Sequence, residues 1–188
     1  MTERSDEQLI GDYLKGDKQA LEFLIKRYLK PIYGFICRYL GGLPEAEDVT
    51  QDVFVRAWRH LKKFNRRKSF RTWLFAIAKN AAFDWLKKKK HFNFSDFTDE
   101  AGNNMLEETL IDPEPLPSEL MERADVGQIL EKALKQLPLS YQTVLILHYN
   151  EHFTLSEIAE ILGEPKNTVK SRHRRGLIIL RKILTAEP

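Results

Sequence analysis

Two histidines and a glutamate in the carboxyl-terminal part of the chain have the spacing of a zinc-binding motif. His148, Glu151 and His152 fit the pattern H-x-x-E-H, in which two imidazoles bind zinc and the carboxylate activates a water molecule for peptide hydrolysis. That chemistry needs both histidines on one continuous helix and a third protein ligand. Here a new helix is predicted to begin at Phe153–Thr154, and no third ligand is evident after it. A zinc peptidase is therefore a remote alternative, and we expect no metal and no other cofactor.

Clustered positive charge is the second chemical feature of the sequence. The 188 residues have a net charge of +3, but residues 1–91 carry +9, residues 92–121 carry −8 and residues 122–188 carry +2. Residues 56–90 hold 13 Lys and Arg against Asp84 alone, and residues 166–182 hold seven against no acidic residue. Clusters of this kind are typical of surfaces that bind phosphate groups.

The spacing of apolar residues at three- and four-residue intervals predicts an all-α fold. No segment shows a sustained two-residue alternation or an Asn-Gly or Asp-Gly hairpin turn, so we predict no strands. Helices are expected over residues 5–15, after Asp17 with an interruption or bend at Pro31, over 45–61 and over 70–90. These helices should form one amino-terminal bundle, with Phe23, Trp58 and Trp73 among the inward-facing side chains.

Residues 92–121 have the composition of a linker. They contain Gly102, Pro113, Pro115 and Pro117 and no basic residue. We therefore expect two small helical domains, at 1–91 and 122–188, joined by a flexible acidic linker. The linker is either a disordered spacer or an acidic strand that lies in a positively charged groove of a partner.

The second domain is predicted to have four helices, of which the last two form a helix-turn-helix. Thr154–Glu157 fits the capping box, so one helix should begin at Leu155. Gly163 supplies the turn, and Pro165 suits the first turn of the next helix, where its missing N–H costs no hydrogen bond. The positions of Gly163 and Val169 relative to the first helix allow the two helices to cross closely.

The last predicted helix has one apolar stripe and one basic face. Val169, His173, Gly176, Leu177, Leu180 and Leu184 share the stripe, and the basic residues lie on the other faces. Arg can bind guanine through two hydrogen bonds, so Arg172, Arg174 and Arg175 are candidate base readers in a major groove. Mixed contacts to phosphates and bases are expected from Lys166, Asn167, Thr168, Lys170 and Ser171. The alternative is a solvated basic helix in an ordinary bundle.

Two blocks of the sequence together resemble one family. Residues 137–149, 153–163 and 168–172 closely resemble the carboxyl-terminal domain of extracytoplasmic-function sigma factors, which are promoter-reading subunits of bacterial RNA polymerase in the sigma-70 family. Residues 45–54 and 70–80 resemble the second conserved region of the same family. The resemblance implies a sigma-2 helical bundle followed by a sigma-4 helix-turn-helix domain that reads the minus-thirty-five element.

The resemblance also gives a role to an acidic patch in the basic amino-terminal domain. Asp48 and Asp52 lie one helical turn apart with Gln51 beside them, where exposed acids would repel DNA. In the family, the matching positions dock on the clamp helices of the largest polymerase subunit, and the carboxyl-terminal domain docks on the flap of the second-largest subunit. Without the resemblance, the patch is an ordinary solvated helix face.

A third set of residues matches the region that opens the minus-ten element and holds an unstacked base. Aromatic platforms and polar groups beside a basic track suit single-stranded nucleic acid. Lys87 and Lys88 are expected to neutralise backbone phosphates. The alternative to a base contact for Trp73 is a role in the hydrophobic core only. The matching residues are Phe64, Asn65, Arg71, Trp73, Lys79 and Asn80.

Two positions depart from the family pattern. His173 stands where the family usually has an aliphatic residue, so we predict a buried or half-buried structural histidine. Gly176 stands where the family usually has Ala, and it should weaken the helix by up to about 1 kcal/mol.

The remaining expectations concern location and partners. The sequence has no apolar run of bilayer length, and residues 1–8 are polar, so we expect a cytoplasmic protein without membrane insertion. Its expected partners are core RNA polymerase, promoter DNA in double-stranded and melted form, and an anti-sigma factor that would hold it at a membrane if itself membrane-bound. A stand-alone helix-turn-helix regulator is the alternative, although no sustained heptad supports the dimer that such proteins usually form.

Overall fold

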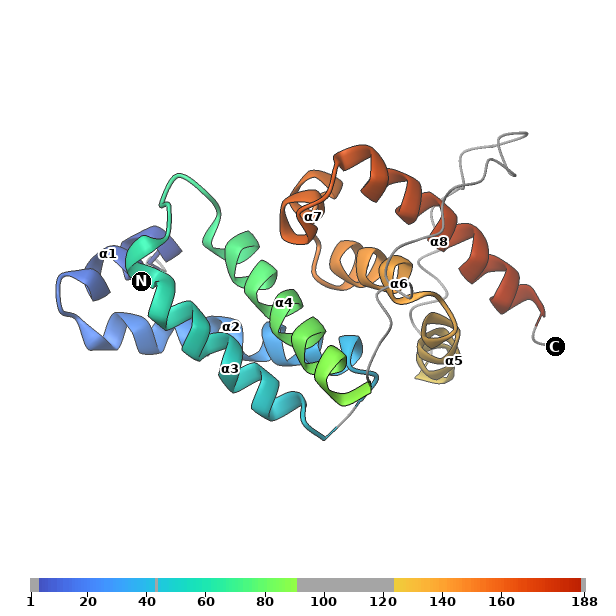
Figure 1. Ribbon diagram of the computed structural model, residues 1–188, viewed down its shortest axis with the longest axis horizontal. Coiled ribbons are helices and arrows are strands. Elements are labelled where there is room, and N and C mark those ends of the chain that lie inside the picture. The colour runs from blue at the N-terminus through green and yellow to red at the C-terminus, as the bar shows by residue number, and fades with distance from the viewer. Residues whose placement is uncertain (1–3, 43, 91–123, 187–188) are drawn as a thin grey trace. The chain divides into compact units, whose positions relative to one another are not determined.

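The computed structural model describes residues 4–42, 44–90 and 124–186 (Figure 1). Within these ranges the chain forms eight α-helices and no β-strand, which confirms the all-α prediction. The described residues divide into two compact units, one of residues 4–42, 44–90 and 156–163 and the other of residues 124–155 and 164–186. The predicted linker, residues 92–121, lies outside the described residues.

The first unit begins with four helices, and the first two of them start at side-chain caps. The Ser5 side chain accepts a hydrogen bond from the Gln8 backbone N–H while the Gln8 side chain accepts one from the Ser5 backbone N–H, so a capping box starts the first helix. Asp17 caps the second helix through the backbone N–H groups of Gln19 and Ala20. The helices are α1 (Asp6–Leu14), α2 (Lys18–Tyr39), α3 (Ala46–His60) and α4 (Phe70–Lys90), and a 3₁₀ turn follows α3 at Leu61–Lys63.

Helix α2 differs from its prediction in two ways. It continues through Pro31, so the predicted interruption is wrong, and Tyr28 and Ile32 on either side of the proline are buried. Phe23 does not face inward: its side chain is 51% exposed and lies beneath the Arg4 guanidinium. Phe23 precedes the buried Leu24 by one residue, which places it about 100° away from Leu24 around the helix.

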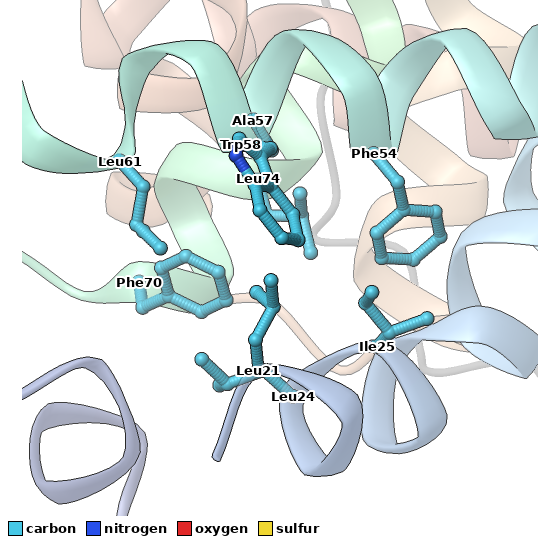
Figure 2. Close-up of a pocket in the computed structure, with 9 residues that line it drawn as sticks. All are labelled: Leu21, Leu24, Ile25, Phe54, Ala57, Trp58, Leu61, Phe70 and Leu74. Atoms are coloured by element: carbon cyan, nitrogen blue, oxygen red, sulfur yellow. The ribbon is translucent and has the colours of Figure 1, made fainter. Parts of the chain in front are cut away.

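Trp58 of α3 also lies at the surface, contrary to the prediction. It is 49% exposed, and its ring packs edge-on against Tyr13 with centroids 5.3 Å apart. One side of the ring borders a small apolar cavity among α2, α3 and α4 (Figure 2). The cavity measures about 20 Å³, which is room for one water molecule, and its lining is apolar, so it is a packing gap and not a ligand site. The lining residues are Leu21, Leu24, Ile25, Phe54, Ala57, Trp58, Leu61, Phe70 and Leu74.

The second unit has a core formed by three helices and a π-helical turn. Its helices are α5 (Ala124–Lys135), α6 (Leu139–Leu145) and α8 (Lys166–Ala186), and the π-helical turn Ile146–Asn150 follows α6. The core residues are Ala133, Leu137, Leu145, Leu177 and Leu180.

Gly176 has a packing role that its helix propensity did not reveal. A Cβ at this position would lie 3.3 Å from Leu145 Cδ1 and 3.4 Å from Tyr141 Cβ, both on α6. The glycine therefore lets α8 approach α6 more closely than a residue with a side chain would allow.

Helix α7 (Leu155–Leu162) begins at the predicted residue and ends at Gly163, whose φ of +69° favours glycine. Ile158 and Ile161 are buried. Because α7 groups with the first unit, the domain boundary at residue 122 stays a prediction.

Candidate nucleic-acid and polymerase interfaces

Helix α8 presents a polar, basic surface opposite its buried stripe. Val169, Leu177 and Leu180 are buried, as predicted, and hold the helix in the unit. The opposite face carries donors of both kinds that DNA recognition uses, charged groups for phosphates and short polar side chains for base edges. The exposed members of the predicted set are Lys166, Asn167, Lys170, Ser171 and Arg175, and Thr168 is half-buried.

Arg172 and Arg174 are less available than their sequence positions suggested. The Nη1 atom of Arg172 donates to the Glu164 carboxylate over 2.6 Å, and only 13% of the Arg172 side chain is exposed. Arg174 is half-buried, and its Nε atom is buried without a hydrogen-bond partner among the described residues. Among the three predicted base readers, Arg175 is therefore the exposed one.

His173 is half-buried within a small aromatic group, in agreement with the prediction of a structural histidine. Its Nε2 atom lies 3.2 Å from the Tyr149 hydroxyl group, and the two rings are stacked. The His148 ring lies edge-on, with centroids 4.9 Å apart. Burial, and to a lesser extent His148, lowers the pKa of His173 below its ordinary value, so the neutral form is favoured.

The H-x-x-E-H segment does not form a zinc-binding arrangement. His148 lies on the π-helical turn, and its Nδ1 atom donates to the Phe153 carbonyl oxygen over 2.8 Å. His152 follows the turn with a positive φ of 54° and is exposed, whereas Glu151 is buried. No group of three metal-ligating side chains occurs in the part of the chain that the structure describes. The segment instead ends one helix and leads into the next.

In the first unit, an aromatic cluster marks the start of α4. Phe64, Phe70 and Trp73 form this aromatic cluster, with centroid distances of 4.9 to 5.6 Å. Phe64 and Phe70 are buried, but Trp73 is half-buried and keeps part of its ring at the surface. Trp73 therefore packs against the core and keeps part of its ring accessible, so it is not a core residue only, and its role at the minus-ten element stays a prediction. Phe64 packs against Trp73 with ring centroids 4.9 Å apart and is less accessible than the sequence suggested.

The polar residues predicted around this cluster occupy the loop before α4 and one side of the helix. Asn65 is exposed, and its side chain accepts a hydrogen bond from the Arg67 backbone, which stabilises the loop turn. Arg71 is half-buried and lies over the Phe75 ring, and Lys79 is half-buried with its ammonium group 3.4 Å from the Asn80 side-chain oxygen. Asn80, Lys87 and Lys88 are exposed. The set thus spreads from the loop along α4.

Three exposed basic residues in that loop were not among the predicted contacts. Arg66, Arg67 and Lys68 follow Asn65 directly and are exposed beside the aromatic cluster. Their charge was evident in the sequence, but only the structure shows that they lie on a loop whose two ends, Phe64 and Phe70, meet in the aromatic cluster.

The predicted acidic patch on α3 is only partly free of counter-charge. Asp48 and Gln51 are exposed, whereas Asp52 is half-buried and its carboxylate lies 2.8 Å from Arg56 Nε. Arg56 also donates to Asp84 on α4 over 2.8 Å. Hydrogen bonding to Asp84, followed by the charges of Asp52 and Asp84, raises the pKa of Arg56. Sequence analysis missed Arg56, which joins the patch to α4.

Helix α8 carries an exposed basic face, and the first unit carries an aromatic cluster beside exposed basic residues, and both features are typical of DNA-binding proteins. Comparison with known families agrees with this class: residues 24–92 match the sigma-70 region 2 family and residues 127–180 match the sigma-70 region 4 family. The region 4 match runs without interruption through α5, α6, α7 and most of α8.

Similarity to characterised proteins extends over nearly the whole chain. The chain is 34% identical to the ECF RNA polymerase sigma factor SigW of Bacillus subtilis (strain 168), over 90% of this chain and 91% of that protein. It is 31% identical to the RNA polymerase sigma-H factor of Pseudomonas aeruginosa, over 92% of this chain and 90% of the relative. The chain belongs to the extracytoplasmic-function sigma factors of the sigma-70 family, and it directs promoter-specific initiation of transcription by RNA polymerase.

Solved structures support the fold. The structure of CnrH in complex with the cytosolic domain of CnrY matches with a TM-score of 0.69 and 22% identity, covering 97% of this chain and 99% of that one. The sigma factor RpoE in complex with the anti-sigma factor NepR from Bartonella quintana matches with a TM-score of 0.64 and 22% identity, covering 89% and 98%. Over residues 4–42, 44–90 and 124–186, no helix has the length and apolar character needed to cross a membrane.

Proposed function

We propose that this sigma factor contacts a promoter at two points through the surfaces described above. Helix α8 reads the minus-thirty-five element, and the region of residues 64–90 opens the minus-ten element. The observation that carries this proposal is the exposed face of α8, where cationic and short polar side chains lie together over a buried stripe. Base and phosphate contacts on this face are assigned to Lys166, Asn167, Thr168, Lys170, Ser171 and Arg175.

The aromatic cluster supplies the second point. Trp73 offers a partly exposed ring on which an unstacked base can lie, and the basic loop beside it can follow the phosphate backbone. Asn65 and Asn80 are exposed and present amide groups that can bond base edges. Arg71 and Lys79 support this surface, and Lys87 and Lys88 extend it as phosphate contacts.

The exposed side of α3 is the proposed docking surface for core RNA polymerase. Asp48 and Gln51 are its accessible polar members, and Asp52 joins them with part of its charge compensated by Arg56. An acidic surface in a basic unit does not suit DNA, so a basic protein surface such as the clamp helices is the better partner. The second unit would contact the flap of the second-largest subunit.

We further propose that the chain acts by binding and not by catalysis, in the cytoplasm, where its polymerase and promoter are found. An anti-sigma factor is a proposed third partner, since the relative from Bartonella quintana was solved with one. For the acidic segment 92–121 the two hypotheses stand as before: it is either a disordered spacer or an acidic strand that lies in a positively charged groove of a partner.

The test is reconstitution of transcription from purified components. The chain and core polymerase together should initiate from a promoter that neither recognises alone, and transcript sequencing would identify that promoter. Asp48→Lys with Asp52→Lys should abolish core binding while circular dichroism stays unchanged. Arg175→Ala should retain core binding and lose selection of the minus-thirty-five element. Promoter binding by the chain without polymerase, at equal strength and specificity, would instead indicate a stand-alone regulator.

A further inference from the structure

Glu164 and Arg172 form a pair that spans the turn before the reading helix. Glu164 precedes α8 by two residues, and Arg172 lies inside α8, so its guanidinium reaches back toward the start of the helix. The Arg172 Nη1 atom and the Glu164 Oε2 atom are 2.6 Å apart. We call this pair the turn clasp.

The turn clasp is more shielded from solvent than the Lys135–Glu131 ion pair of the same unit. Its side chains are 13% and 31% exposed, whereas the Lys135–Glu131 pair of α5 is 45% and 65% exposed. A short charge-assisted hydrogen bond in such a place is stronger than an exposed pair and is costly to separate. DNA would have to displace Glu164 before Arg172 could form two hydrogen bonds with the edge of a base.

Glu164 also lies where DNA would approach the reading helix. Lys166 and Asn167 follow it directly and are exposed at the start of α8. A carboxylate there repels phosphates unless a cation compensates it, and Arg172 provides that cation.

We propose that Glu164 is a specificity-determining positioning residue, which holds Arg172 back from the groove and leaves base selection to Lys170, Ser171 and Arg175. This inference rests on the proposed role of α8 as reader of the minus-thirty-five element. It predicts opposite outcomes for removing the two members of the clasp.

The experiment measures binding of reconstituted holoenzyme to promoter duplexes that differ only in the minus-thirty-five element, over a range of salt concentrations. In Glu164→Gln, Arg172 no longer has the Glu164 charge beside it and should gain a phosphate contact, so the slope of log affinity against log salt should steepen by about 0.9. Affinity for a scrambled element should rise, and discrimination against it should fall by about threefold or more. Glu160→Gln, which removes the same charge from an exposed site on α7, is the matched control.

In Arg172→Gln, the uncompensated Glu164 carboxylate should weaken binding to every sequence by the same factor. The double variant Glu164→Gln with Arg172→Gln should therefore bind within about twofold of the wild-type protein, because neither charge remains. Helical circular dichroism and thermal melting of each variant establish that the fold is retained, and Arg172→Met, which also removes the charge but keeps a long side chain, replaces Arg172→Gln if the latter unfolds.

Two results would overturn the inference. One is a loss of preference at a single base pair in Arg172→Gln, which would make Arg172 a base reader. The other is a Glu164→Gln variant that behaves like Glu160→Gln. Lys170→Ala and Arg175→Ala test the proposed function separately. If both variants leave selection of the minus-thirty-five element unchanged, α8 is not the reader and the proposed function itself fails. If they reduce selection, only the inference about Glu164 fails.

Discussion

Tyr28 lies edge-on to Phe70, with ring centroids 5.5 Å apart and ring planes inclined by 68°. The Tyr28 hydroxyl group donates a hydrogen bond to Asp6, which also accepts one from Arg27. Burial, followed by the hydrogen bond to Asp6, raises the pKa of Tyr28 above its ordinary value. Because Phe70 belongs to the aromatic cluster, Tyr28 connects α1 to the proposed minus-ten surface.

This connection predicts that Asp6→Asn destabilises the first unit more than Tyr28→Phe does. The first change leaves the partly buried Arg27 without its charged partner, at an expected cost of about 1–3 kcal/mol, whereas the second removes one hydroxyl group and should cost about 1 kcal/mol. Urea unfolding followed by tryptophan fluorescence measures both. Asp12→Asn, which breaks a more exposed pair with Arg4, should cost less than about 1 kcal/mol. Equal losses in all three variants would refute the prediction.

Gly176→Ala should destabilise the second unit even though Ala favours helices. The gain in helix propensity is about 1 kcal/mol, but the added methyl group would press on Leu145 and Tyr141, and crowding of a packed core typically costs about 1–3 kcal/mol. Gly127→Ala is the matched control, because a Cβ at Gly127 of α5 meets no atom within 4 Å. Chemical denaturation should show a loss for Gly176→Ala and a gain of up to about 1 kcal/mol for Gly127→Ala. A gain in both variants would mean that α6 shifts to make room.

Stability of the second unit should fall in mild acid because of His173. Its pKa is lowered in the folded protein, so just below pH 6.5 the unfolded chain binds more protons than the folded one. The stabilisation is therefore complete above the unfolded pKa of about 6.5 and is lost as the pH falls through that value toward the folded pKa. His173 faces His148 and Tyr149, and His148 contributes to the lowered pKa.

This dependence is measured by urea unfolding of the protein at several pH values, with NMR signals from α8 used to follow the unfolding of the second unit. His173→Gln should flatten the change between pH 5.5 and pH 7.5, and His148→Gln should reduce it by a smaller amount, since burial is the larger cause of the shift. An unshifted His173 titration in the folded protein would show that the ring is solvated.

The helices and the buried stripe of α8 could be predicted because they depend on local order in the sequence. The period of apolar residues fixes which face of a helix is buried, and caps such as Ser5 fix where it starts. Residues at the edge of a stripe are harder to predict, since a helical period leaves the burial of Phe23 and Trp58 undecided. Their exposure depends on how wide a face the neighbouring helices cover.

Pairings between elements could not be predicted in this way. Helical spacing suggests partners three or four residues apart, but Glu164 and Arg172 are eight residues apart across a turn, and Arg56 reaches Asp84 on another helix. The need for a glycine at position 176 likewise comes from its packing against α6, and the sequence of α8 alone does not show that contact. The candidate site was thus predicted by residue type, while the availability of each side chain required the structure.

The Asp52–Arg56 pair predicts that the two acids of the proposed polymerase-docking surface contribute unequally. Asp48 makes no ion pair within the described residues, whereas part of the Asp52 charge is already compensated by Arg56. Asp48→Asn should therefore weaken binding to core polymerase by about two- to fivefold, and Asp52→Asn should weaken it less. Fluorescence anisotropy of labelled chain titrated with core enzyme measures the difference at physiological salt.

Arg56→Gln completes this test, because it removes the compensating charge and leaves the Asp52 carboxylate in place. In the Arg56→Gln background, Asp52→Asn should cost as much core affinity as Asp48→Asn does in the wild-type protein, so the two substitutions should be coupled. Asp84→Asn also breaks a bond to Arg56 but lies on α4, and it serves as the control for loss of the α3–α4 connection. Additive effects of Arg56→Gln and Asp52→Asn would show that Arg56 does not screen Asp52. In that case both acids would face the polymerase with their full charge.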